Sequence, residues 1–208
     1  MKLALFGANG MIGSRILSEA LRRGHQVTAV VRDPAKFAMR HKNLTVVKGD
    51  VLDADGVASA VKGHDAVLSA VGSSTEVITG AVRSLSDGLT RAGVKRLVVV
   101  GGSGSLEVAP GIQLIDSPQF PKEWLAPARA HSAALATFRK NTTLDWTNVS
   151  PPALIAPGER TGKFRLGTDQ LVTDAKGESR ISAEDYAIAF LDEVERPQHI
   201  RQRFTVGY

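Results

Sequence analysis

A short apolar segment at the N-terminus runs directly into a glycine-rich turn, and this junction limits the fold more than any other feature. Leu3–Phe6 is typical of a buried strand, and Gly7, Gly10 and Gly13 follow it closely. Apolar residues then recur at helical spacing until Gly24, which favours the end of a helix. A strand, a glycine turn and a helix in this order predict a dinucleotide-binding fold, with the pyrophosphate at the helix N-terminus, where free N–H groups and the helix dipole favour anions. The residues expected around the pyrophosphate are Gly7, Asn9, Gly10, Met11, Ile12 and Gly13.

The residues after the second predicted strand bear on the choice of cofactor. Val27–Val31 is this strand, and folds that bind NAD commonly place an acidic residue at its end to contact the ribose 2′-hydroxyl. Here Arg32 comes first, and its guanidinium can pair with a 2′-phosphate, with Lys36 one helical turn further. We therefore predict NADPH. If Asp33 rather than Arg32 faces the ribose, the preference returns to NADH.

Length and composition are those of one globular domain. The 208 residues are 43% hydrophobic, which is enough for a sizeable core, and we expect one domain over residues 1–208. The chain has no cysteine, which excludes disulfides and thiolate chemistry, and we predict no metal site. The net charge of +5 comes from dispersed cations with few aromatic residues, so we expect an anionic cofactor and substrate rather than nucleic acid.

The sequence shows neither a targeting segment nor a membrane-spanning run. Met1 and Lys2 lead straight into the first strand, and no apolar run approaches the length of a transmembrane helix. We therefore expect a cytoplasmic protein that does not bind membranes, present as a monomer or a weak homodimer.

Strands and helices alternate along the chain without linkers or repeats. Continuous valine-rich runs separated by amphipathic helices are typical of a parallel sheet covered on both faces. We predict a doubly wound α/β fold, a three-layer α/β/α Rossmann domain. Further strands are expected at 44–51, 65–72, 95–100, 144–149 and 203–206, and helices at 54–61, 77–92 and 183–194.

The carboxyl ends of these strands supply the next candidates, because such ends share one crevice in a doubly wound sheet. Asp50 and Val51 end the third strand, where a carboxylate can accept a hydrogen bond from the adenine amino group. Ala70, Val71 and Gly72 end the fourth strand, where small side chains admit the middle of the cofactor. Glycine and serine at 101–105 follow the fifth strand, where we expect the nicotinamide; a plain glycine loop is the alternative.

Together these motifs resemble a known family. The segments at 7–13, 49–51, 70–72 and 150–152 are similar to those of atypical short-chain dehydrogenase/reductases with NmrA-like or NAD(P)H-binding domains. The resemblance is closest to the NADH-flavin reductases and more distant to the biliverdin reductase B/flavin reductase type. It covers nearly the whole chain and includes the segments at 158–165 and 181–187. It implies a Rossmann fold and an NAD(P)H-dependent reductase.

One departure from ordinary short-chain dehydrogenases is informative. The Tyr-x-x-x-Lys pair that protonates a carbonyl is missing, and His131 and Leu135 stand in its place. Carbonyl reduction is therefore disfavoured, because the developing oxyanion has no usual proton donor. A flavin or quinone delocalises the charge and takes its proton from water, so we expect a free flavin or quinone as substrate and no permanently bound flavin. An NmrA-like redox sensor without turnover is the alternative. A nucleotide-sugar or isomerase-type enzyme with an extended substrate domain is a third possibility, which the short C-terminal portion disfavours.

The resemblance also implies roles at the nicotinamide end. Ser103 and His131 would line the pocket as catalytic residues, with His131 donating to a substrate oxygen or supplying a proton near neutral pH; a histidine with only local contacts is the alternative. Pro151 and Pro152 would turn across the nicotinamide. Residues from about 150 to 208 are expected to form the substrate rim.

Within this rim, Arg160 and Phe164 combine a cation with an aromatic ring, which suits a phosphate-bearing flavin such as FMN. A solvated loop with a core phenylalanine is the alternative.

Overall fold

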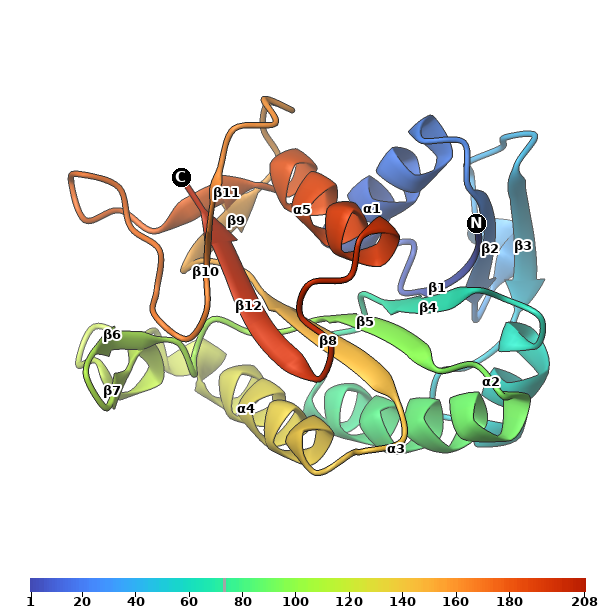
Figure 1. The fold of residues 1–208 in the computed structure, drawn as a ribbon, viewed down its shortest axis with the longest axis horizontal. Helices are drawn as coiled ribbons and strands as arrows, with labels where there is room; N and C mark the ends of the chain where they lie inside the picture. Colours follow the sequence, from blue (N-terminus) through green and yellow to red (C-terminus); the bar gives the residue numbers. More distant parts are fainter. Residues whose placement is uncertain (73) are drawn as a thin grey trace.

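The computed structural model describes residues 1–72 and 74–208, which form an eight-stranded sheet between two layers of helices (Figure 1). The strand order is β10-β12-β8-β5-β4-β1-β2-β3, and neighbouring strands are parallel except for β10, which is antiparallel to β12. The order changes direction between β1 and β4, as in the predicted doubly wound fold. The strands are β1 (Lys2–Phe6), β2 (Gln26–Val31), β3 (Leu44–Lys48), β4 (Ala66–Ser69), β5 (Arg96–Val100), β8 (Asp145–Ser150), β10 (Arg165–Gly167) and β12 (Gln202–Gly207).

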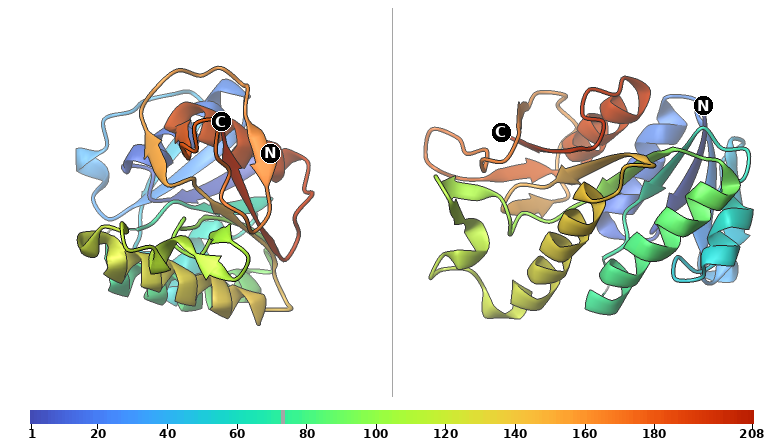
Figure 2. Two further views of the ribbon diagram at one scale, coloured as in Figure 1. Left: turned by 90° about the vertical axis from the view of Figure 1, so that its left-hand side faces the viewer. Right: turned by 60° about the horizontal axis from the view of Figure 1, so that its bottom comes forward.

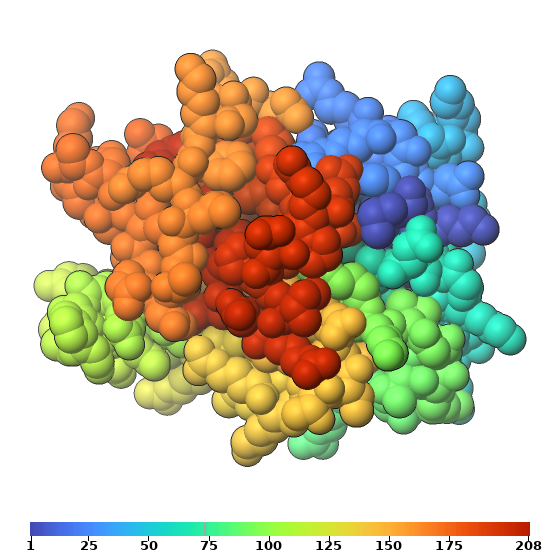
Figure 3. Space-filling model, in the orientation of Figure 1, coloured from blue at the N-terminus to red at the C-terminus, as the bar shows by residue number. Residues whose placement is uncertain are grey.

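Helices cover both faces of the sheet, which confirms the predicted three-layer Rossmann architecture. Two helices, α1 (Met11–Arg22) and α5 (Ala183–Glu195), pack side by side on the upper face in Figure 1. The lower face carries α2 (Ala54–Val61), α3 (Thr75–Ala92) and α4 (Leu125–Arg139). Residues after about 150, orange and red in Figure 3, form the left and centre of that face of the molecule, and the N-terminal segments lie to the right.

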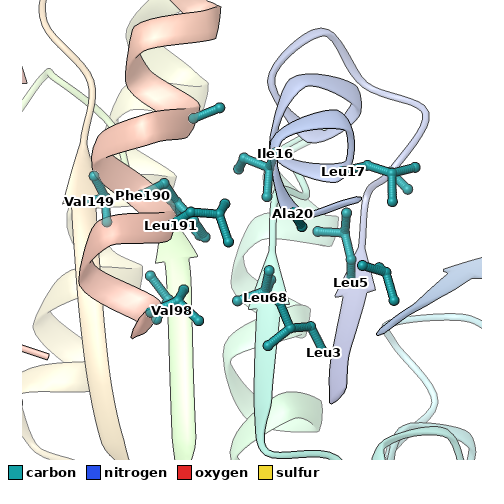
Figure 4. Close-up of a cluster of buried hydrophobic side chains, with 14 of the residues drawn as sticks. Leu3, Leu5, Ile16, Leu17, Ala20, Leu68, Val98, Val149, Phe190 and Leu191 are labelled. Atoms are coloured by element: carbon teal, nitrogen blue, oxygen red, sulfur yellow. The ribbon is translucent and has the colours of Figure 1, made fainter. Parts of the chain in front are cut away.

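The alternation of side chains along each strand divides the core in two. Leu3 and Leu5 point toward α1 and α5, whereas Ala4 and Phe6 of the same strand join the cluster between the sheet and the helices α2, α3 and α4. Figure 4 shows the upper cluster, in which Ile16 of α1 lies above β1 and β4. Burial on both faces explains why the strands read as continuous apolar runs rather than as alternating ones.

Two predicted strands are shorter than expected. The third ends at Lys48 and the fourth at Ser69, so 49–51 and 70–72 lie in loops beyond the sheet. In the third strand the physical reason is a local turn after Gly49: the carboxylate of Asp50 accepts a hydrogen bond from the backbone N–H of Leu52 at 3.0 Å, and the Asp50 carbonyl accepts one from the Asp53 N–H at 3.1 Å.

Several strands of two or three residues were not predicted, because so few residues show no periodicity. They are β6 (Glu107–Ala109), β7 (Ile112–Gln113), β9 (Leu154–Ala156), β10 and β11 (Arg180–Ser182). Two of these follow the carboxyl ends of long strands, since β6 comes after β5 and β9 after β8. The views in Figure 2 show the small strands extending the molecule at this end. Within the part of the chain that the structure describes, no helix is long and apolar enough to cross a membrane.

A buried carboxylate joins the rim to α1. Glu19 of α1 is 4% exposed and accepts two hydrogen bonds from the guanidinium of Arg160, at 2.8 and 2.9 Å, and one from Arg23 at 2.8 Å. The hydrogen bond from Arg160, ahead of the contributions of Arg23, lowers the pKa of Glu19 to about 2. Because 141 residues separate Glu19 from Arg160, this pair closes the C-terminal segment onto the first helix.

We predict that this carboxylate makes the fold sensitive to acid. Its pKa is lower in the folded state than in the unfolded chain, so its stabilising contribution is complete above about pH 4.5 and is lost as the pH falls toward 2. The expected loss is about 2 kcal/mol. Urea unfolding of wild type and Glu19→Gln at several pH values checks this, because the free energy of unfolding of the variant should fall less steeply between about pH 5 and pH 2. Parallel acid profiles of the two proteins would contradict it.

Candidate functional site

A cleft of about 560 Å³ lies at the carboxyl ends of the central strands, where the strand order changes direction between β1 and β4. This is the position at which doubly wound sheets bind their ligands. The lining residues are Phe6, Gly7, Ala8, Asn9, Gly10, Met11, Ile12, Val30, Val31, Arg32, Gly49, Asp50, Val51, Leu52, Ala70, Val71, Gly72, Val77, Val100, Gly101 and His131. The structure thus brings most of the predicted cofactor residues together in one cleft.

The glycine turn leaves no room for side chains at two positions. A Cβ atom on Gly13 would lie 2.0 Å from the carbonyl oxygen of Gly7, and one on Gly7 would lie 2.5 Å from that of Ala70. Gly7 also has a φ of +85°, which favours glycine. Gly13 does not itself line the cleft. Its part is to let α1 approach the turn closely.

The N-terminus of α1 faces the cleft without a neutralising group. No side chain caps the helix at Gly10, and its first turn contains no acidic residue. Met11 and Ile12, the first residues of the helix, line the cleft. The free N–H groups and the helix dipole therefore favour an anion such as a pyrophosphate here.

Arg32 lines the end of this cleft that lies beyond β2, and Asp33 does not line the cleft. The Asp33 carboxylate accepts a hydrogen bond from the Ala35 N–H at 3.1 Å and pairs with Lys36 at 3.3 Å, capping a short 3₁₀ helix, η1 (Pro34–Lys36). Among the described residues, the Arg32 guanidinium has no hydrogen bond or ion pair. Lys36 lies outside the lining set, with its side chain 84% exposed. Of the described residues that line this end of the cleft, Arg32 is thus the one lysine or arginine, and it is available to contact a ligand.

His131 of α4 lies at the opposite end of the cleft. A Cβ atom on Gly72 would lie 3.7 Å from its Nε2, and one on Gly102 would lie 2.8 Å from its Cβ, so the imidazole packs between two backbone segments. Burial lowers the pKa of His131 to about 4. The ring is therefore neutral at pH 7, which suits a group that donates or accepts a hydrogen bond better than a general acid.

Three other residues that were predicted at this end do not line the cleft. Ser103 is half-buried in the loop after β5, and its carbonyl accepts a hydrogen bond from the Leu106 N–H at 2.9 Å. Pro151 and Pro152 are buried between the end of β8 and β9. Their contact with a nicotinamide stays a prediction.

Arg160 and Phe164 do not lie in the cleft. Arg160 pairs with Glu19, and Phe164 packs against the core beneath α1 and α5. The loop between them is held by Asp185, which is fully buried and accepts hydrogen bonds from the backbone N–H groups of Thr161 and Gly162, both at 2.8 Å. In this structure the segment joins the rim to the two helices of the upper layer, as expected from the alternative of a core phenylalanine.

Some cleft residues were not named from the sequence, chiefly Leu52, Val77 and Val100. Val100 ends β5 and Leu52 follows Asp50 and Val51 directly, so position at a strand end was the available signal. Val77 lies on α3, and no sequence signal distinguished it from the core residues of that helix.

Comparison with known proteins agrees with this geometry. Residues 7–197 match the model of a family described as NAD(P)H-binding. Over 212 residues the chain is 41% identical to the uncharacterized protein YwnB of Bacillus subtilis strain 168, covering 99% of this chain and 98% of YwnB.

Two solved structures are similar over their full length. A "putative exported protein" from Burkholderia pseudomallei has a TM-score of 0.93 and 51% identity, with 100% of both chains covered. A "putative NADH-flavin reductase" from Streptococcus pneumoniae TIGR4 has a TM-score of 0.88 and 35% identity, covering 100% of this chain and 99% of that one. These similarities confirm the sequence resemblance.

We predict that Gly10→Ala separates ligand binding from folding. Gly10 has a φ of −72°, which alanine adopts, and its Cβ would lie 3.4 Å from the nearest atom, so the free energy of unfolding should change by less than about 1 kcal/mol. The added methyl group would stand where the backbone approaches a pyrophosphate, so the affinity for NADPH should fall about tenfold or more.

Gly13→Ala is the matched comparison, because its Cβ would clash with the backbone and lower stability as well. Thermal unfolding and NADPH titration of both variants check the two effects. If Gly10→Ala binds NADPH as tightly as wild type, the pyrophosphate does not lie at this turn.

Proposed function

This chain belongs to the NAD(P)H-binding family, and we propose that it is an NADPH-preferring reductase that passes hydride to a free flavin, quinone or similar conjugated acceptor. The acceptor takes hydride from the nicotinamide and a proton from water, so NADPH, a proton and the oxidised acceptor give NADP⁺ and the reduced acceptor. The protein binds and orients both reactants and holds no permanent flavin.

The observation that carries this proposal is that both tyrosine hydroxyls make hydrogen bonds within the folded chain and away from the cleft. Tyr186 is fully buried, and its hydroxyl donates to the Val149 carbonyl at 2.6 Å. The Tyr208 hydroxyl donates to Asp185 at 2.9 Å. Neither lines the cleft, so neither is placed to protonate a carbonyl substrate. A neutral His131 lines the end of the cleft where we propose the nicotinamide, which favours an acceptor that does not need a proton from the protein.

The preference for NADPH is supported by Arg32. Its side chain lines the cleft without a partner among the described residues, whereas the neighbouring Asp33 is engaged with Ala35 and Lys36. A guanidinium at the end of the second strand can form parallel hydrogen bonds with a 2′-phosphate. The ribose of NADH would leave this cation unpaired.

The flavin acceptor is supported by the name of the Streptococcus pneumoniae relative. The proposal also includes a cytoplasmic location and a monomeric or weakly dimeric state. Oxidation of NADPH and NADH, followed by absorbance with FMN, riboflavin and a panel of quinones, tests the activity. Saturable turnover that prefers NADPH supports the reductase. Tight NADPH binding without turnover by any acceptor would replace it with a dinucleotide sensor.

We predict that Arg32→Ala changes cofactor choice. Removing a charge-assisted pair with the 2′-phosphate should lower kcat/KM for NADPH about 10- to 100-fold, while the value for NADH changes less than about threefold. Lys36→Ala is the control, because its ammonium is 84% exposed and pairs with Asp33, so both values should stay within about twofold of wild type. Equal losses with NADPH and NADH in Arg32→Ala would contradict the role of Arg32.

We predict that His131 acts as a neutral hydrogen-bonding group. With a pKa of about 4, only about one molecule in a thousand carries imidazolium at pH 7, and protonation of His131 adds no break to kcat between about pH 6 and 8. His131→Ala should lower kcat about tenfold by the same factor across this range. A wild-type kcat that falls as the pH rises through about 6.5, together with a flat profile for the variant, would show instead that imidazolium supplies the proton.

A further inference from the structure

The loop that follows β5 is rich in residues that do not restrain a backbone. Residues 101–105 are three glycines and two serines, yet the loop begins in the cleft lining at Gly101 and contains Ser103. A loop of this composition keeps one shape only if its surroundings impose it. The contacts at its two ends show how this happens.

The first end is enclosed by β8 and α4. The N–H of Gly101 donates to the Val149 carbonyl at 2.8 Å, and the buried carboxamide of Asn148 occupies the space where a Cβ on Gly101 would stand, with its Oδ1 at 2.1 Å from that position. Gly102 lies against His131 in the same way. The start of the loop is therefore fixed by steric contact.

At the second end, a guanidinium adds to the burial of Leu106 and to the hydrogen bond between the Leu106 N–H and the Ser103 carbonyl. Arg203 lies on β12 with its side chain 4% exposed. Its Nη1 donates to the carbonyl of Ser105 at 3.1 Å and to the Ser105 hydroxyl at 2.9 Å. The other edge of the same guanidinium binds Asp169, with Nε donating to Oδ1 at 2.9 Å and Nη2 donating to the same oxygen.

Asp169 links Arg203 to the end of the loop by a second route, through its own backbone. Its backbone carbonyl accepts a hydrogen bond from the Glu107 N–H at 2.8 Å, immediately after the loop. The carbonyl of Gly104 accepts a further hydrogen bond from the Ile115 N–H at 2.9 Å. Arg203 thus fastens residue 105 directly and residue 107 through Asp169.

We propose that Arg203 is a positioning residue that holds the 101–106 loop in place against the nicotinamide half of the cofactor. This inference rests on the proposed function, because the loop meets a nicotinamide only if a dinucleotide fills the cleft. A planar guanidinium can serve two partners on different edges at once, which a lysine ammonium on a flexible stem does less well. Preorganisation of this kind favours both binding and hydride transfer.

The test compares two ligands, NADPH and 2′,5′-ADP, which lacks the nicotinamide half. In Arg203→Ala the affinity for 2′,5′-ADP should stay within about twofold of wild type, because the residues expected to bind it follow β1, β2 and β3 or begin α1, away from Arg203. The affinity for NADPH should fall about tenfold, and kcat with FMN should fall about tenfold or more. Arg203→Lys should give affinity and kcat values between those of Arg203→Ala and wild type, because lysine keeps the charge and can bind one of the two partners.

Thr147→Val controls for a general loss of stability. The buried hydroxyl of Thr147 takes part in hydrogen bonds with Arg96, Glu193 and His199 at the amino end of β8, away from the cleft. Its loss should lower the melting temperature while leaving the NADPH to 2′,5′-ADP affinity ratio unchanged. If Arg203→Ala also leaves this affinity ratio unchanged, whether or not both affinities fall, Arg203 has only a structural role and the proposal is overturned. Absence of turnover in wild type would refute the reductase, whereas the affinity ratio would still decide the role of Arg203.

Discussion

Steric exclusion at the first turn decides where everything else in the molecule lies. The oxygen of Gly7 stands 2.0 Å from where Gly13 would carry a Cβ, and Gly7 itself presses against the carbonyl of Ala70. α1 can therefore start close to the ends of β1 and β4, and its apolar face meets the sheet without a gap. The same approach leaves the helix N-terminus open to the cleft. An uncapped helix N-terminus at the cleft and the packing of α1 on the sheet thus both depend on one close contact between backbone segments.

The long elements and this turn could be predicted from the sequence, because their signals are local. Apolar runs such as Leu3–Phe6 and the helical spacing after Gly10 depend only on residues close in the chain. The strand-end residues Asp50, Val51 and Gly72 were found for a related reason, since parallel strands deliver their carboxyl ends to one edge. For them, topology converts sequence position into spatial position.

Residues whose partners lie far away in the chain could not be assigned in this way. Arg160 was predicted to contact substrate, but its partner is Glu19, 141 residues earlier, and nothing in the local sequence announces that pairing. The burial that lowers the pKa of His131 is likewise a property of two backbone segments packed around it. The bridge from Arg203 to Ser105 spans 98 residues. Arg160 was interpreted as a ligand group because its structural partner cannot be identified from residues near it in the sequence.

This distribution of roles also bears on the chemistry. Several polar side chains of the C-terminal segments stabilise the fold through hydrogen bonds. Tyr186 binds the end of β8, Tyr208 binds Asp185, and Arg203 binds the loop after β5. Among the described residues that line the end of the cleft where we propose the nicotinamide, His131 is the one titratable side chain, and it is neutral at pH 7 because burial lowers its pKa to about 4. In the proposed reductase, a site built in this way would orient the hydride donor and bind its phosphate, but it would have little means of stabilising a localised oxyanion. Its reactivity should therefore follow the ability of the acceptor to delocalise charge, which is the property that flavins and quinones share.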